Sequence, residues 1–96
     1  MYATVRQYKS MKANAVEELT RRRQDVESLI RKVPGFETYH LLKTDDGMTS
    51  VTVCKDQAGA EESNRQVAAW IKEHMPTLLP APPEVSAGEV LIHTGK

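Results

Sequence analysis

Cysteine is nearly absent from this chain, since Cys54 is the only one among its 96 residues. A single thiol cannot form a disulfide within the chain, which favours a reducing compartment such as the cytoplasm. No apolar run approaches the roughly 20 residues that a membrane span needs. The N-terminus shows no apolar core behind a basic region, so the sequence predicts no secretory signal. We therefore expect a cytoplasmic protein with no membrane partner.

Neither sign of charge is in excess, because thirteen basic residues balance thirteen acidic ones. This balance argues against nucleic acid or an anionic membrane as the main partner. The only basic cluster is the run of three arginines at 21–23, which has acidic side chains on the neighbouring turns. Such a pattern is typical of a solvated helix surface, with a phosphate-binding patch as the alternative.

Recognisable catalytic motifs are also missing. The sequence contains no phosphate-binding loop, no dinucleotide-binding glycine pattern and no nucleophile elbow. Its three histidines, His40, His74 and His93, lack the close spacing of a metal site. The length predicts one domain over residues 1–96, near the small end of what folds alone, so a further interface would help to stabilise it.

The residue pattern predicts four strands and two helices. Strands are expected over residues 2–9, 36–43, 48–55 and 84–94, the last centred on the apolar run 90–92. Apolar residues at helical spacing predict helices over 14–33 and 57–75.

Turn and capping residues set the expected boundaries of these elements. Asn14 with Glu17 has the form of a capping box, and Asp56 can cap the second helix. Pro76 ends that helix, and the proline-rich segment 77–83 is expected to be a stiff linker.

The order strand, helix, strand, strand, helix, strand predicts an α+β fold of the ferredoxin-like split βαβ type. Its four-stranded antiparallel sheet would carry both helices on one face. The runs 41–42 and 90–92 place apolar side chains on both faces, because adjacent strand residues point in opposite directions. The uncovered face needs a cover, and a second copy of the chain is the simplest one. We expect a homodimer joined sheet to sheet.

The second helix has a polar residue on its buried face. Asn64 interrupts an otherwise apolar stripe, whose other members are Ala60, Val67, Ala68, Ile71 and Met75. Burying a carboxamide without partners costs roughly 1–3 kcal/mol. Asn64 therefore either bonds nearby groups or points into a pocket, and the sequence leaves both alternatives open.

The stretch 33–36 (Val-Pro-Gly-Phe) is followed by Tyr39, a short hairpin and the stretch 51–56, which leads into an Ala- and Glu-rich helix. Over about residues 1–90 this arrangement resembles the antibiotic biosynthesis monooxygenase domain family. The resemblance implies a dimeric α+β barrel fold. Family members oxidise polycyclic phenols without a cofactor, degrade haem, or act on quinols, in a cleft between the sheet and the helices.

The resemblance implies a cofactor-independent monooxygenase that acts on a small aromatic or quinol-type molecule. The alternatives are a non-catalytic homodimer that binds a small ligand or is structural, and a haem-handling protein. The Asn–Trp pair of the phenol oxygenases is not reproduced, because Trp70 lies about 120° from Asn64 around the helix. The haem-degrading pattern matches poorly, with Gln7 as the nearest first-strand amide and His74 only one turn after Trp70.

The candidate catalytic residues are Asn64 and His40. Asn64 would orient the substrate or stabilise an oxyanion, and His40 could act as a base if its face of the strand meets the helices. A hydrogen-bonded structural histidine is the alternative for His40.

Four further residues are candidates for substrate binding. Trp70 could line the cleft or anchor the packing, and the corner residue Tyr39 could do either. Arg23 could bind a ligand or pack its stem while its guanidinium reaches solvent. His74 could lie at the rim of the cleft or interact with the helix end. No metal site is predicted.

Overall fold

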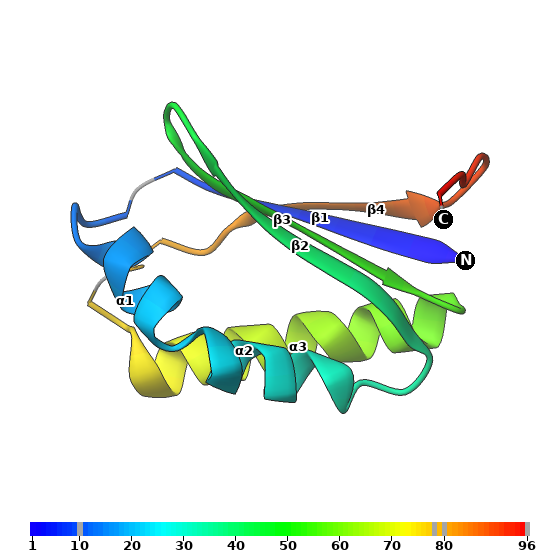
Figure 1. Cartoon of the computed structure of the whole chain (residues 1–96), viewed down its shortest axis with the longest axis horizontal. Helices are drawn as coiled ribbons and strands as arrows, with labels where there is room; N and C mark the ends of the chain where they lie inside the picture. Colours follow the sequence, from blue (N-terminus) through cyan, green and yellow to red (C-terminus); the bar gives the residue numbers. More distant parts are fainter. Residues whose placement is uncertain (10, 78, 80, 96) are drawn as a thin grey trace.

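The computed structural model describes residues 1–9, 11–77, 79 and 81–95. Its elements are, in order, β1 (Tyr2–Tyr8), α1 (Ala15–Arg21), α2 (Arg23–Arg31), β2 (Phe36–Thr44), β3 (Gly47–Cys54), α3 (Gln57–His74) and β4 (Glu84–Glu89). The strands form one antiparallel sheet in the order β2-β3-β1-β4. All the helices lie on one face of that sheet (Figure 1). The predicted α+β, ferredoxin-like split βαβ architecture is confirmed.

The helix expected over residues 14–33 is two helices, which meet at Arg22 (φ −98°, ψ 17°). Between Leu19 and Val26, the side of the helix that faces the sheet carries no apolar residue that could pack on it. Arg21 and Arg22 instead both bind Glu18 on the surface, so little holds the chain straight at this point.

The start of the first helix is as predicted, but its cap is not. The helix begins at Ala15, directly after Asn14, whose side chain makes no capping hydrogen bond. The cap of α3 does form, because the Gly59 N–H donates to Asp56 Oδ1 at 2.9 Å.

The prediction that the last strand is centred on residues 90–92 is wrong. β4 ends at Glu89, and Leu91 and Ile92 are 88% and 85% exposed. The physical reason is the register, because Glu89 already pairs with Tyr2, the first residue of β1. Beyond Glu89, the Val90 N–H donates to the Met1 carbonyl at 2.9 Å.

Close packing joins the start of α3 to the corner before β2. Gly35 adopts φ +77°, which favours glycine, and its carbonyl accepts from the Lys55 N–H at 2.8 Å. A Cβ at Gly59 would lie 2.5 Å from the carbonyl oxygen of Pro34. The helix therefore reaches its position over the sheet only with glycine at 59.

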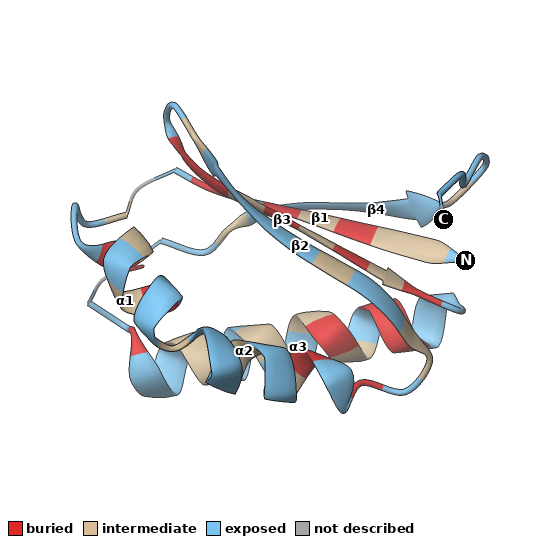
Figure 2. Ribbon diagram, viewed as in Figure 1, coloured by how far each residue is buried: buried red, intermediate tan, exposed pale blue. Residues whose placement is uncertain are grey.

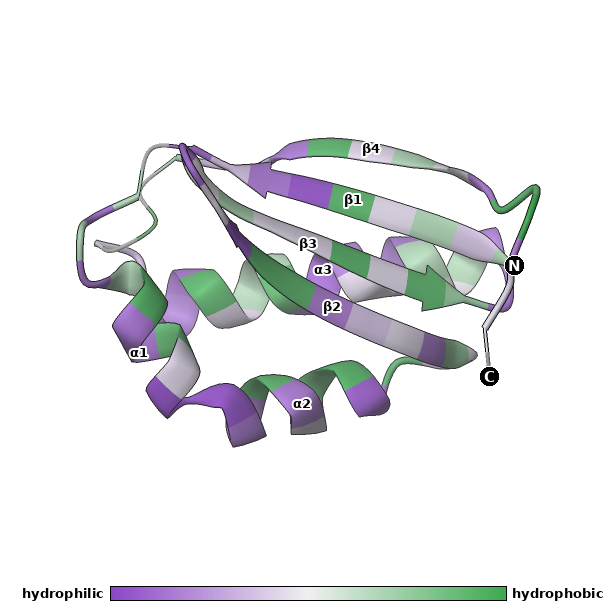
Figure 3. Cartoon of the chain, turned by 45° about the horizontal axis from the view of Figure 1, so that its top comes forward, coloured by the Kyte–Doolittle hydropathy of each residue, from purple (hydrophilic) through white to green (hydrophobic). Residues whose placement is uncertain are grey.

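The two faces of the sheet have an unusual distribution of polarity. The buried side chains that face the helices on the two central strands include Thr4, Arg6, Ser50 and Thr52. The opposite face carries the half-buried residues Ala3, Val5, Val51 and Val53. Figure 2 shows burial concentrated in β1, β3 and the inner side of α3, and Figure 3 shows the alternation of hydropathy along β3. A polar layer thus lies where a helix covers the sheet.

In the part of the chain that the structure describes, no helix is long and apolar enough to cross a membrane.

Candidate functional site

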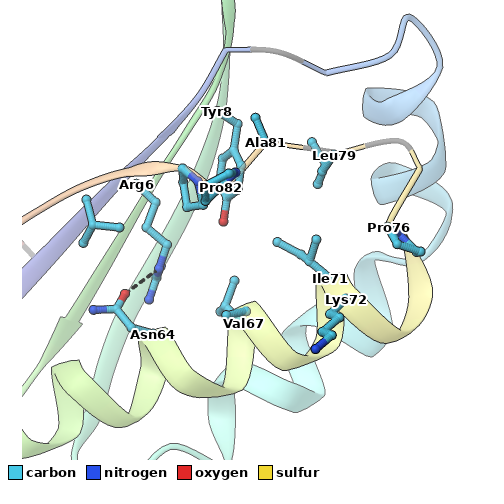
Figure 4. A pocket seen from close by; sticks show the side chains of 13 residues that line it. Arg6, Tyr8, Asn64, Val67, Ile71, Lys72, Pro76, Leu79, Ala81 and Pro82 are labelled. Carbon is cyan, nitrogen blue, oxygen red and sulfur yellow. Dashed lines mark hydrogen bonds between the residues drawn. The ribbon is translucent and has the colours of Figure 1, made fainter.

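A cavity of about 510 Å³ lies between β1, α3 and the segment that precedes β4. Figure 4 shows its lining side chains converging from these three elements. Most of the walls are apolar, and the polar or charged lining groups are Arg6, Tyr8, Asn64 and Lys72. The segment 77–83, predicted as a stiff linker, supplies one wall through Leu79, Ala81, Pro82 and Pro83. Leu78 and Pro80 of this segment lie outside the described residues.

The inner end of the cavity is built around the guanidinium of Arg6, which is only 2% exposed. Its Nε–H donates to Asn64 Oδ1 at 2.7 Å. Its Nη1 donates to Ser50 Oγ at 3.2 Å and to Thr52 Oγ1 at 2.9 Å. Its Nη2 donates to Ser63 Oγ at 2.8 Å. Both central strands and α3 therefore hold one charged group in place.

The charge of Arg6 has no counter-ion among the described residues. All four of its hydrogen-bond acceptors are neutral, and none of the ion pairs in the described part of the chain includes Arg6. Burial lowers the pKa of Arg6, yet arginine remains charged in proteins. Burying an ion costs several kcal/mol unless an opposite charge offsets it. An uncompensated cation beside a cavity is a typical feature of a ligand site.

Asn64 combines the two roles that the sequence left open. Its side-chain oxygen is bound by Arg6, and the residue also lines the cavity (Figure 4). Because Oδ1 accepts from the guanidinium, the orientation of the carboxamide is fixed. The amide nitrogen makes no hydrogen bond within the described residues, so it is available as a donor.

Tyr8 contributes a neutral hydroxyl, which points into the cavity (Figure 4). Burial raises the pKa of Tyr8 to about 12, and the nearby Arg6 charge opposes only part of this effect. The phenol is therefore a hydrogen-bond donor at neutral pH. Among the described lining residues there is no carboxylate and no histidine. The cavity can stabilise an anion, but its described walls offer no side chain that would take a proton.

Trp70 and Tyr39 line a different and much smaller cavity of about 30 Å³. Four residues border both cavities and separate them: Tyr8, Val67, Ile71 and Leu79. Burial raises the pKa of Tyr39, in keeping with its position under the helices. The structure thus does not bring Trp70 and Asn64 together in one cavity.

His40 lies on the face of the sheet away from the helices. Its predicted role as a base in the cleft required the opposite face, the one that meets the helices. A bulge between Phe36 and Thr38 is the physical reason. Phe36 pairs with the buried Cys54, but after the bulge His40 pairs with Val51 of the outer face. His40 is exposed and lines neither cavity.

The remaining two candidates are also outside the cavities. Arg23 is exposed at the start of α2. His74 is exposed in the last turn of α3, and its ring centroid lies 5.0 Å from that of Trp70. Neither residue lines the site around Asn64.

Arg6 was not among the residues predicted for the site. Its signal in the sequence is strand parity, because Arg6 alternates in phase with Thr4 and Tyr8. A single arginine in a strand is usually exposed, so the alternation alone did not single it out.

Comparison with known proteins supports the fold. No protein-family model and no curated protein matches the sequence. A protein of unknown function from Nitrosomonas europaea is 23% identical, with a TM-score of 0.74 over 99% of this chain and 92% of that one. The haem degrader MhuD of Mycobacterium tuberculosis, solved with two haems in its active site, is 18% identical, with a TM-score of 0.71 over 99% and 100%. A monooxygenase of Streptomyces coelicolor, solved with nanaomycin D, is 20% identical, with a TM-score of 0.62 over 96% and 91%.

These likenesses show a small α+β fold, and in this chain the fold encloses a cavity under the third helix. More particularly, the chain has the fold of the antibiotic biosynthesis monooxygenases, as the resemblance in the sequence predicted.

Proposed function

We propose that the cavity under α3 binds a small aromatic or quinol-type molecule, and that the chain oxidises it with dioxygen and without a cofactor. The observation that carries this proposal is the pairing of apolar walls with the Arg6–Asn64 group at one end. Apolar pockets with a few fixed polar groups are typical of small-molecule sites. The similarity in fold to a monooxygenase and a haem degrader adds support.

The chemistry follows from stabilisation of an anion. A phenol or enol must ionise before it gives an electron to dioxygen. The charge of Arg6 and the amide nitrogen of Asn64 would stabilise the resulting oxyanion, and the apolar walls would exclude water. The proton leaves to solvent. With an anthrone, one oxygen atom replaces the two hydrogens of the reactive ring carbon to form a ketone, and the other leaves as water.

The alternative function is non-catalytic binding of a small ligand. One observation favours it, namely that no carboxylate or histidine lines the cavity among the described residues. Haem handling fits less well, because the described walls offer no histidine that could serve as an axial ligand.

Oxygen uptake with a panel of anthrones and hydroquinones tests the enzyme. We expect uptake by the wild type and a loss of about tenfold or more in Asn64→Ala, as for removal of an oxyanion donor. Gln66→Ala is the matched control, because Gln66 is an exposed carboxamide on the same helix. Uptake that survives Asn64→Ala contradicts the role of Asn64. Binding without uptake across the panel supports the non-catalytic alternative.

We further propose that two copies of the chain associate through the faces of their sheets that carry no helix. Val5, Val51 and Val53 form an apolar surface there, and Leu42 on β2 is 49% exposed. Apolar strand residues without a covering layer are typical of an interface. Leu91 and Ile92, which are exposed, come shortly after β4, an edge strand of this sheet.

A further inference from the structure

We infer that the ligand of this cavity carries an oxyanion, and that Arg6 is its counter-ion. The inference rests on the proposed function only in taking the cavity under α3 as a ligand site, and it holds whether or not a reaction follows.

The hydrogen bonds of Arg6 leave one donor unused. A guanidinium has five N–H groups, and the described partners Asn64, Ser50, Thr52 and Ser63 accept four of them. The remaining Nη2–H can serve one further acceptor. The guanidinium is therefore suited to bind a single oxygen atom rather than to bind both oxygens of a carboxylate in a bidentate manner.

The described residues supply hydrogen-bond donors for an anion at this site, but none of them supplies the anion. All four acceptors around Arg6 are neutral, so the network orients the guanidinium without cancelling its charge. The hydroxyl of Tyr8 is a further donor that points into the same cavity, and Asn64 and Lys72 also line it. An anionic oxygen satisfies these donors and also offsets the buried charge.

The remaining walls of the cavity determine the size and the apolar character of the ligand. Val67, Ile71, Leu79 and the proline-rich segment before β4 form apolar walls around about 510 Å³. This volume lies within the usual range for a small organic ligand. The geometry thus selects a ring system of two or three rings with a negatively charged oxygen at one end.

Binding of 2-naphthoate and 2-naphthamide, measured by calorimetry, tests the inference. The two probes share a ring system and differ in charge, since one carries a carboxylate and the other a neutral amide. We expect 2-naphthoate to bind the wild-type chain about tenfold more tightly or better, as for a charge-assisted hydrogen bond. Equal affinities, or tighter binding of 2-naphthamide, overturn the inference but leave the cavity as a ligand site. Failure of both probes to bind overturns the inference together with the proposed site.

Two variants assign the preference to Arg6. Arg6→Met should abolish the preference for 2-naphthoate, so that the two probes bind the variant with similar affinities. Arg65→Met is the matched control, because it removes an exposed arginine of α3 and should keep the preference. A preference that persists in folded Arg6→Met, or that vanishes in Arg65→Met, contradicts the assignment. If Arg6→Met does not fold, Arg6→Lys replaces it, with a reduced preference expected because a single ammonium cannot keep all four bonds.

Discussion

At the scale of single residues, a few buried polar side chains under α3 determine which kind of ligand the cavity can bind. Arg6 lies where the face of a covered sheet normally carries an aliphatic side chain, and Thr4 beside it has a buried hydroxyl with no partner among the described residues. Polar groups of this kind reduce stability unless they are satisfied. Their concentration under α3, where Arg6 borders the cavity, is what we expect where stability has been exchanged for binding.

Tyr8 links this site to a measurable dependence of stability on pH. Burial raises its pKa to about 12, whereas the unfolded phenol titrates near 10. The unfolded chain therefore loses the proton first as the pH rises. The contribution of Tyr8 to the free energy of unfolding is complete below pH 10. It falls by about 1.4 kcal/mol per pH unit between pH 10 and pH 12.

Denaturant unfolding between pH 8 and pH 12 checks this dependence. Tyr8→Phe should reduce the decline in the free energy of unfolding, whereas Tyr2→Phe, at the end of the same strand, should keep it. The same decline in both variants would show that Tyr8 is not the group responsible.

At the scale of elements, a close contact with the corner before β2 fixes the position of the first turn of α3. Gly59→Ala should lower the free energy of unfolding by about 2 kcal/mol, because the new Cβ would lie 2.5 Å from the Pro34 carbonyl. The sign of this change in the free energy of unfolding tests the contact, because alanine in a helix interior otherwise stabilises a protein by about 1 kcal/mol over glycine.

Gly88→Ala is the control for this variant, because nothing lies within 4 Å of a Cβ at that position of β4. Urea unfolding of both variants provides the comparison. A stabilised Gly59→Ala would mean that the helix does not lie against the corner as described.

The order of the elements follows from local patterns in the sequence, but some details do not. Periodicity and turn residues predicted the four strands, the cap at Asp56 and the stop near Pro76. The early end of β4 at Glu89 depends on where the neighbouring strand β1 begins. Such limits are set by tertiary register, which a local pattern does not contain.

The site was less predictable than the fold because its geometry is assembled over long distances in the chain. Asn64 was singled out by its place on an apolar stripe, and it does line the cavity. The face on which His40 lies was reversed by one bulge, which shifts the alternation of β2. The partners of Arg6 lie 44 to 58 residues away, so the burial of that side chain was not visible in its own strand.

At the scale of the whole molecule, the apolar face of the sheet is where we propose that a second copy of the chain binds. Val51→Lys would place a charge at the centre of the proposed sheet-to-sheet contact and should dissociate the dimer. Sedimentation should give twice the 10.8 kDa chain mass for the wild type and the single-chain mass for the variant.

Gln24→Lys, on the exposed surface of α2, is the matched control and should remain dimeric. A wild-type chain that sediments as a single 10.8 kDa particle at micromolar concentration would contradict the proposed interface.

The most direct measurement for the account as a whole is a crystal structure of the chain grown with 2-naphthoate. We predict that the ring system occupies the space between β1, α3 and the proline-rich segment, with one carboxylate oxygen within hydrogen-bond distance of Arg6 Nη2. A structure in which the chain's own side chains fill that space, or in which the probe binds elsewhere while Arg6 pairs with a carboxylate of the protein, would contradict the assignment of this ligand site.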